Sequence, residues 1–237
     1  MDESVLLTLT PGKSDLAKAR LLEAGLSVFA EKGLKGATVR EIAGHADQNV
    51  AAISYYFGNK ERLYRAVVEG IAREIRRRMA DVIGEIDAFR NQPKKEPREA
   101  LRLLQLALRS IYLRLTSRTS ALPIGRFIMR EQTQPSAEFE ILYSQVFREL
   151  HQRLSFLVAT VLRIDPADEE AILRTHALIG QLWFFAVARE TILRRLGWRD
   201  LEGENAERVA ALVEEHVEIL LFGLVARSKG RRKASKK

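Results

Sequence analysis

The segment QNVAAISYYFGNK, residues 48–60, gathers side chains that are suited to hydrogen bonding with a nucleic acid. Carboxamides such as those of Gln48 and Asn49 can pair with two positions of adenine at once, and alanine methyl groups can lie against thymine methyl groups. Tyrosine hydroxyls and lysine ammonium groups suit phosphate oxygens. The chemistry that this segment predicts is therefore recognition of bases and phosphates.

Helical spacing divides the segment into an inner and an outer face. Val50, Ile53 and Phe57 lie at positions i, i+3 and i+7, so they share one face and are expected to point into the core. The other residues face outward or lie at the border, and we predict that they contact DNA together with an upstream threonine. This set is Thr38, Gln48, Asn49, Ala51, Ala52, Ser54, Tyr55, Tyr56 and Lys60.

Three of these positions have an alternative role that the sequence leaves open. Gln48 and Asn49 can stabilise the turn, with Asn49 capping the helix that follows. Thr38 can cap a helix, contact a phosphate, or do both. Thr38 and Glu41 have capping-box spacing, in which the hydroxyl accepts from one free amide and the carboxylate reaches back to another.

Short helices must position this segment. The pattern predicts a helix-turn-helix unit with a supporting helix in front of it. In this unit a short helix begins after Thr38, a tight turn follows, and a second short helix ends at Gly58. The expected helices of this unit cover 14–33, 39–45 and 49–57. Helical periodicity then continues through the chain, with no sustained alternation of period two and only six prolines. Further helices are expected over 60–89, 98–116, 124–131, 135–163, 166–196 and 204–227, so the predicted fold class is all-α.

The first third of the chain carries a family resemblance. GATVREIA (36–43), the turn after it and YYFGNKERLY (55–64) resemble the TetR/AcrR family of one-component transcriptional repressors. The resemblance covers residues 14–65 and agrees in spacing and residue type across three helices. This family often has Gly-Val-Ser in the turn and a glycine in the second helix. This chain has Ala-Asp-Gln-Asn (46–49) in the turn and Ala51-Ala52 in the second helix. The base-reading residues are therefore expected to be particular to this chain.

The later segments RFIMREQTQPS (126–136), RTHALIGQ (174–181) and RETILRRLGW (189–198) resemble the CecR-like branch of that family. This resemblance implies a larger helical domain that binds an effector and forms a dimer. The predicted divisions are a flexible N-terminal arm over 1–13, a helix-turn-helix DNA-binding domain over 14–60, a helical ligand-binding and dimerisation domain over 61–228, and a basic tail over 229–237.

A mixture of aromatic, cationic and amide side chains in the larger domain suggests a pocket for a partly aromatic, polar or anionic effector. The predicted lining is Phe127, Arg130, Gln132, His176 and Trp183. Alternatively, the run Arg130-Glu131-Gln132 serves only to satisfy helix ends.

Apolar faces on the last two predicted helices indicate a homodimer in which two helices from each chain form a four-helix bundle. The predicted interface is Gly180, Phe184, Val187, Val213, His216 and Leu220. The alternative is that these faces are buried within one chain.

Composition narrows the function further. The chain has no cysteine, which excludes disulfides and thiolate metal sites, and its four histidines are too scattered to predict a metal site. The longest apolar run, LWFFAVA (182–188), is far shorter than the ~20 residues of a membrane span, so a cytoplasmic protein is expected. The net charge is +8, and seven of these positive charges lie in residues 227–237. This segment can be a solvated end, or it can bind phosphates without sequence preference.

The predicted function is a ligand-responsive transcriptional repressor that binds a near-palindromic operator as a dimer, without a cofactor. The alternative is a helical enzyme or small-molecule carrier with a vestigial helix-turn-helix. The absence of a plausible nucleophile, base or metal set in the sequence argues against the enzyme.

Overall fold

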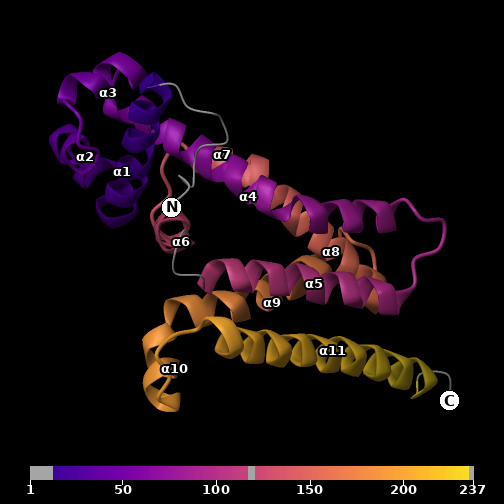
Figure 1. Ribbon diagram of the computed structural model, residues 1–237. Helices are drawn as coiled ribbons and strands as arrows, with labels where there is room; N and C mark the ends of the chain where they lie inside the picture. The colour runs from indigo at the N-terminus through magenta and orange to yellow at the C-terminus, as the bar shows by residue number, and fades with distance from the viewer. Residues whose placement is uncertain (1–12, 117–120, 235–237) are drawn as a thin grey trace. The chain divides into compact units, whose positions relative to one another are not determined.

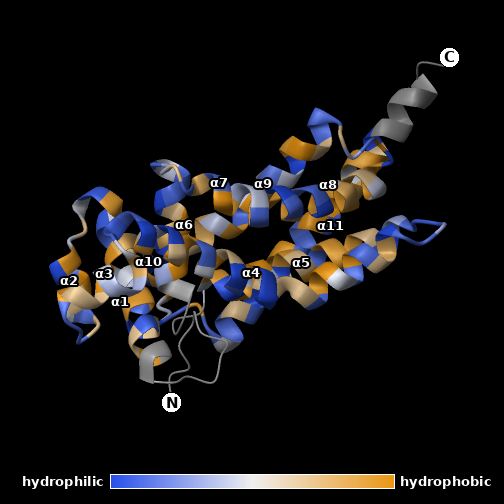
Figure 2. Ribbon diagram, turned by 90° about the horizontal axis from the view of Figure 1, so that it is seen from above, coloured by the Kyte–Doolittle hydropathy of each residue, from blue (hydrophilic) through white to orange (hydrophobic). Residues whose placement is uncertain are grey.

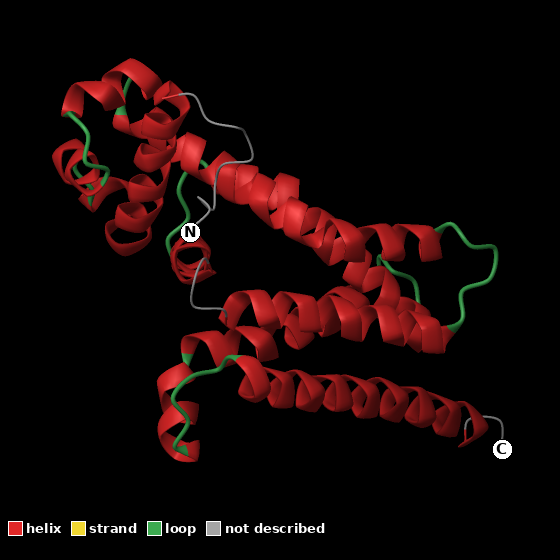
Figure 3. Ribbon diagram, in the orientation of Figure 1, coloured by secondary structure: helices red, strands yellow, loops and turns green. Residues whose placement is uncertain are grey.

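The computed structural model describes residues 13–116 and 121–234, and all regular elements in these ranges are helices (Figure 1, Figure 3). The predicted all-α fold class is therefore confirmed. Most of the predicted N-terminal arm and the last three residues of the predicted basic tail lie outside the described residues.

The helices group into two compact units. The first unit contains the helix-turn-helix elements, the beginning of a long helix up to Arg78, and a later group that returns to pack on α1. Its elements are α1 (Lys13–Gly36), α2 (Val39–His45), α3 (Val50–Phe57), the first part of α4 (Lys60–Arg90), α6 (Ala121–Thr133), α7 (Phe139–Leu142) and the π-helix η1 (Tyr143–Phe147).

Aromatic rings fill the centre of this unit. The Tyr64 ring meets the Phe29 ring edge-on at 4.8 Å between centroids and lies 5.3 Å from the Phe127 ring. All three residues are buried, and they come from α1, α4 and α6. The core around the helix-turn-helix motif therefore includes a residue of α6, a helix far from the motif in sequence.

The second unit begins at Met79 in α4 and contains the long helices that follow. Its α5, α8, α9 and α11 pack against one another, and α10 packs against α9. Its further elements are α5 (Pro97–Thr116), α8 (Arg148–Leu162), α9 (Glu169–Val187), α10 (Arg189–Leu196) and α11 (Gly203–Ala234). In Figure 1, α11 runs alongside α5 for much of its length.

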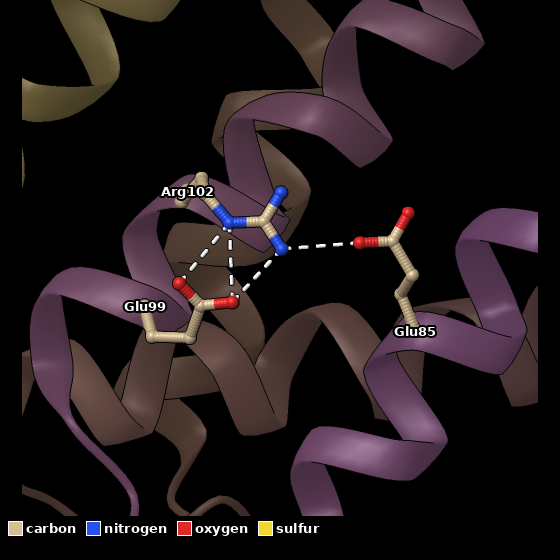
Figure 4. Close-up of polar contacts among 3 residues, drawn as sticks. All are labelled: Glu85, Glu99 and Arg102. Atoms are coloured by element: carbon tan, nitrogen blue, oxygen red, sulfur yellow. Dashed lines mark hydrogen bonds and ion pairs between the residues drawn. The ribbon is translucent and has the colours of Figure 1, made fainter.

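Ion pairs fasten the distal part of α4 within the second unit. Arg102 on α5 donates to both oxygens of Glu99 and to Glu85 of α4 at 3.0 Å (Figure 4). Arg153 on α8 donates to both carboxylate oxygens of Asp87, each at 3.0 Å. The far end of α4 is thus held by contacts to both α5 and α8.

Amphipathic patterning explains which faces are buried. Figure 2 shows apolar and polar residues on different sides of helices such as α5, and the buried side of α5 consists mainly of leucine and alanine. An apolar stripe of this width must pack against other helices to leave water. Among the described residues, no single helix is long and apolar enough to span a bilayer; α9 and α10 pass that test only when taken as a pair, and they are bent by 66°.

Three predictions about the elements differ from the structure. The predicted domain boundary at residue 60 is not where the two units divide. The first unit includes the part of α4 up to Arg78, and it also includes α6, which packs on α1. The predicted helix over 166–196 is two helices that meet at Ala188, where neither glycine nor proline gives a signal. The predicted helix over 135–163 begins at Phe139 and contains a π-helical turn.

Candidate nucleic-acid interface

Thr38 caps the start of helix α2. The Thr38 hydroxyl accepts a hydrogen bond from the Glu41 amide at 3.2 Å, which confirms its predicted capping role. The Glu41 carboxylate, expected to reach back to Thr38, pairs instead with Lys32 at the end of α1. The hydrogen bond from Lys32 holds the pKa of Glu41 below its usual value. One half of the predicted capping box is therefore replaced by an ion pair between α1 and α2.

The turn between α2 and α3 is fixed by its own polar groups. Asp47 adopts a left-handed backbone with φ of 51°, a conformation that aspartate tolerates better than most residues do. The Gln48 side-chain amide donates to the Asp47 carbonyl at 2.8 Å. The Asn49 side-chain oxygen accepts from the Ala51 amide at 2.9 Å and caps α3. The alternative role of Gln48 and Asn49 in the turn is thus present, and the Asn49 amide nitrogen is not used in the cap.

Helix α3 presents a mixed face of small and aromatic residues to solvent. Ile53 and Phe57 are buried as predicted, but Val50 is 37% exposed, so its prediction as a core residue is wrong. Val50 is the first residue of α3 and directly follows the loop between α2 and α3. None of the predicted DNA-binding residues is buried. Those exposed are Thr38, Asn49, Ala51, Ser54 and Tyr55, and those partly exposed are Gln48, Ala52, Tyr56 and Lys60.

The two tyrosines of α3 stand edge to face. Their ring centroids are 4.9 Å apart with an interplanar angle of 82°, and Tyr55 is 80% exposed. Aromatic pairs of this geometry are favourable beyond the area that they bury. Tyr56 therefore supports a neighbouring ring that extends from the helix into solvent.

Lys60 makes a contact that the sequence did not predict. Its ammonium donates to the Ala37 carbonyl at 2.9 Å, just before the cap of α2. An ammonium has three donors, so this bond leaves two for other acceptors. Asn59, also not predicted, accepts from the Arg62 amide at 2.8 Å and directly precedes α4. An asparagine directly before a helix is a known capping signal, and it would have identified this residue.

The five residues predicted for an effector pocket do not form one site within either unit. Phe127, Arg130 and Gln132 lie on α6 in the first unit, whereas His176 and Trp183 lie on α9 in the second. Phe127 is enclosed by the aromatic core, and the Arg130 guanidinium is engaged by backbone carbonyls of α1. The alternative role of this run, in satisfying a helix end, is the one that Arg130 has.

Most of the predicted dimer residues are accessible on the second unit. Gly180, Phe184 and Val187 are exposed on α9, and His216 and Leu220 are exposed on α11. Val213 is only 3% exposed, because its side of α11 packs on the chain's own helices. Val213 is therefore a core residue and not part of an accessible apolar face.

Histidines approach each other at one place in the second unit. The rings of His151 on α8 and His176 on α9 lie 5.7 Å apart between centroids. Burial, with a smaller effect from His176, lowers the pKa of His151. In the described parts of the chain, no three His, Cys, Asp or Glu residues are grouped so as to hold a metal ion.

Comparison with known families matches both parts of the chain. Residues 21–67 match the family described as bacterial regulatory proteins of the tetR family. Residues 97–224 match the C-terminal domain of the HTH-type transcriptional dual regulator CecR. The chain belongs to the TetR family of transcriptional regulators and carries a C-terminal domain of the CecR type.

Individual relatives agree with this assignment. The HTH-type transcriptional dual regulator CecR of Shigella flexneri is 38% identical over 91% of this chain and 96% of its own length. A TetR-like regulator from Rhodococcus sp. RHA1 has the same fold, with a TM-score of 0.55 at 18% identity over 90% of this chain and all of the other. The structure of the TetR family regulator PfmR from Thermus thermophilus matches with a TM-score of 0.52 at 14% identity. The match covers 90% of this chain and 97% of PfmR. The CecR relative, which matches most of both chains, is a transcriptional regulator, so the alternative of an enzyme with a vestigial helix-turn-helix is not supported.

Proposed function

We propose that this regulator is a dimeric, ligand-responsive repressor that binds a near-palindromic operator, with α3 of each protomer in a major groove. The observation that carries the proposal is the exposed face of α3, which combines small residues at its start with Tyr55 extended into solvent. Small side chains allow the helix to approach base edges closely, and a hydroxyl can reach the phosphates. A bound dimer would then exclude other proteins from the same DNA.

Within this interface, base reading and phosphate binding fall to different residues. Gln48 and Asn49 lie directly before the first turn of α3, near the end of the helix where recognition helices contact base edges. Each uses one polar group in the turn, so the roles of turn stabilisation and base contact are compatible. Thr38, Tyr55 and Lys60 are proposed as phosphate contacts, and the bond from Lys60 to Ala37 holds its ammonium beside the start of α2.

An exposed apolar face on α9 and α11 supports the proposed dimer. Large apolar residues there remain open to solvent, although the two helices contact each other within the chain. Contiguous apolar patches on a protein surface commonly mark interfaces. We name this surface the α9–α11 face and define it as Leu173, Gly180, Phe184, Val187, Leu212, His216, Ile219 and Leu220.

A small-molecule effector is proposed to bind the second unit, in line with the CecR-type domain over 97–224. Of the five residues predicted for its pocket, His176 and Trp183 belong to this unit. An effector changes operator affinity only through its different affinities for two states, with a coupling that is typically about 5- to 150-fold. A cytoplasmic location is proposed with this function.

Selection of bound sequences from a random DNA pool tests this proposal, at one stated salt concentration. We expect an inverted repeat whose half-sites are about one helical turn, roughly 34 Å, apart. Ala51→Glu places a negative charge on the exposed face of α3 and should abolish enrichment. Ala88→Glu, the same change at an exposed position of α4 in the second unit, is the matched control. Enrichment without repeat symmetry, or enrichment by the Ala51 variant, would contradict the proposal.

A further inference from the structure

An arginine of α6 holds the end of α1. The Arg130 guanidinium donates one hydrogen bond to the Glu31 carbonyl and one to the Lys32 carbonyl, both at 3.1 Å. The regular helix is interrupted immediately afterwards at Gly33, with φ of 68° and ψ of 178°. Carbonyls at a helix end lose their usual intrahelical partners. Arg130 supplies donors there from a helix about a hundred residues away in sequence.

Gly33 leaves the space that this contact needs. A Cβ at residue 33 would lie 2.4 Å from Nε of Arg130 and 2.8 Å from Nη2. The positive φ at this position also favours glycine over residues that carry a side chain. Both the backbone conformation and the close approach of the guanidinium therefore depend on the absence of a side chain here.

The neighbouring residue of α6 is fixed to α4. Glu131 is 1% exposed, and its carboxylate accepts from the Tyr64 hydroxyl at 2.6 Å and from the Ser136 hydroxyl at 2.8 Å. Burial, together with the hydrogen bond to Glu131, raises the pKa of Tyr64. A buried carboxylate with hydrogen-bonding partners is costly to displace. Consecutive residues of α6 thus bind α1 on one side and α4 on the other.

The end of α1 leads directly to the proposed phosphate contacts. Four residues separate Gly33 from Thr38, the cap of α2. Lys60 holds the intervening Ala37 carbonyl, and Lys32 pairs with Glu41 of α2. A shift at the end of α1 would be passed to the start of α2 through these bonds. Binding groups must be held within about 0.5 Å of their productive positions, so a fixed end of α1 matters for affinity.

We propose that Arg130 is a positioning residue for DNA binding: it fixes the end of α1, and with it the start of α2, without touching DNA. This inference rests on the proposed DNA-binding function. It assigns to α6 a part of the DNA-binding unit that lies outside the helix-turn-helix motif.

The test measures DNA affinity and its salt dependence for three variants. Arg130→Met removes both hydrogen bonds, Arg130→Lys keeps the charge without the paired geometry, and Arg126→Met removes the same charge from an exposed site on α6. We expect Arg130→Met to weaken operator binding about tenfold, with an unchanged slope of log affinity against log salt. Arg130→Lys should weaken binding by an intermediate factor, and Arg126→Met should leave it unchanged.

Each outcome separates positioning from direct contact. A slope reduced by about one in Arg130→Met would mean that Arg130 contacts a phosphate, and unchanged affinity would mean that it positions nothing; either result overturns the inference. Circular dichroism checks that the variants fold, and if Arg130→Met does not, Arg130→Lys alone decides. If the unaltered protein binds no DNA, the proposed function fails, which is distinct from a variant that binds as well as the unaltered protein.

Discussion

Phe184 offers the sharpest test of the proposed dimer. Its side chain is 72% exposed in the protomer, and fully burying a phenylalanine contributes about 1.5–3 kcal/mol. A twofold interface buries the residue twice. Phe184→Ala should therefore remove about 2–4 kcal/mol of dimerisation free energy and raise the dimer Kd roughly 30- to 700-fold. The protomer itself should change by less than ~0.5 kcal/mol, because the substitution is on an exposed helical position.

Sedimentation equilibrium over a range of concentrations gives the dimer Kd, and urea unfolding gives the stability of the chain. Tyr143→Ala is the control, since Tyr143 is also an exposed aromatic residue but lies in the first unit; its dimer Kd should not change. Val213→Ala should have a different effect, a loss of stability of about 1 kcal/mol or more from a buried site. An unchanged dimer Kd in Phe184→Ala would refute the assignment of the α9–α11 face.

Three further predictions concern charge and hydrogen bonding. Lys60→Ala should weaken binding to all DNA sequences similarly and reduce the salt slope by about one, whereas Gln48→Ala should alter sequence preference; filter binding across salt concentrations, with a selected and a scrambled site, distinguishes them. Burial lowers the pKa of His151, so the unfolded state binds more protons as pH falls through about 6.5, and stability should decrease. His151→Gln should remove that part of the pH dependence in urea unfolding, and a dependence equal to that of the unaltered protein would contradict this. Tyr64→Phe should cost about 1–3 kcal/mol, because a buried carboxylate loses a donor, and a thermal melt without a decrease would count against it.

Local sequence signals were sufficient for the DNA-binding motif. Ser, Thr and Asn caps, glycine stops and 3.6-residue periodicity act within a few residues, so they predicted α2, α3 and the start of α4. They also predicted which residues of α3 are buried, except at Val50. The role of Thr38 as a cap followed from its spacing to Glu41, although the carboxylate itself is drawn to Lys32.

Long-range packing was not available to the same reasoning. Nothing in the α6 sequence shows that Arg130 lies against the end of α1, because residues about a hundred positions apart make that contact. From the sequence alone, Arg130 and the aromatic and polar residues near it on α6 therefore fit the pattern of a pocket. The prediction of Val213 as a dimer-interface residue fails for a related reason. An apolar stripe shows that a helix face is buried, but not whether it packs on the same chain or on a second copy.

Hydroxyl-radical footprinting of the selected DNA site tests the central claim most directly. The account predicts two protected segments, related by a twofold axis and centred about one helical turn apart, because each protomer places one α3 in a major groove. It also predicts that both segments lose protection together in Phe184→Ala at concentrations where that variant is monomeric. A single protected segment, or two that persist independently in the monomeric variant, would contradict the account of this chain as a dimeric operator-binding regulator.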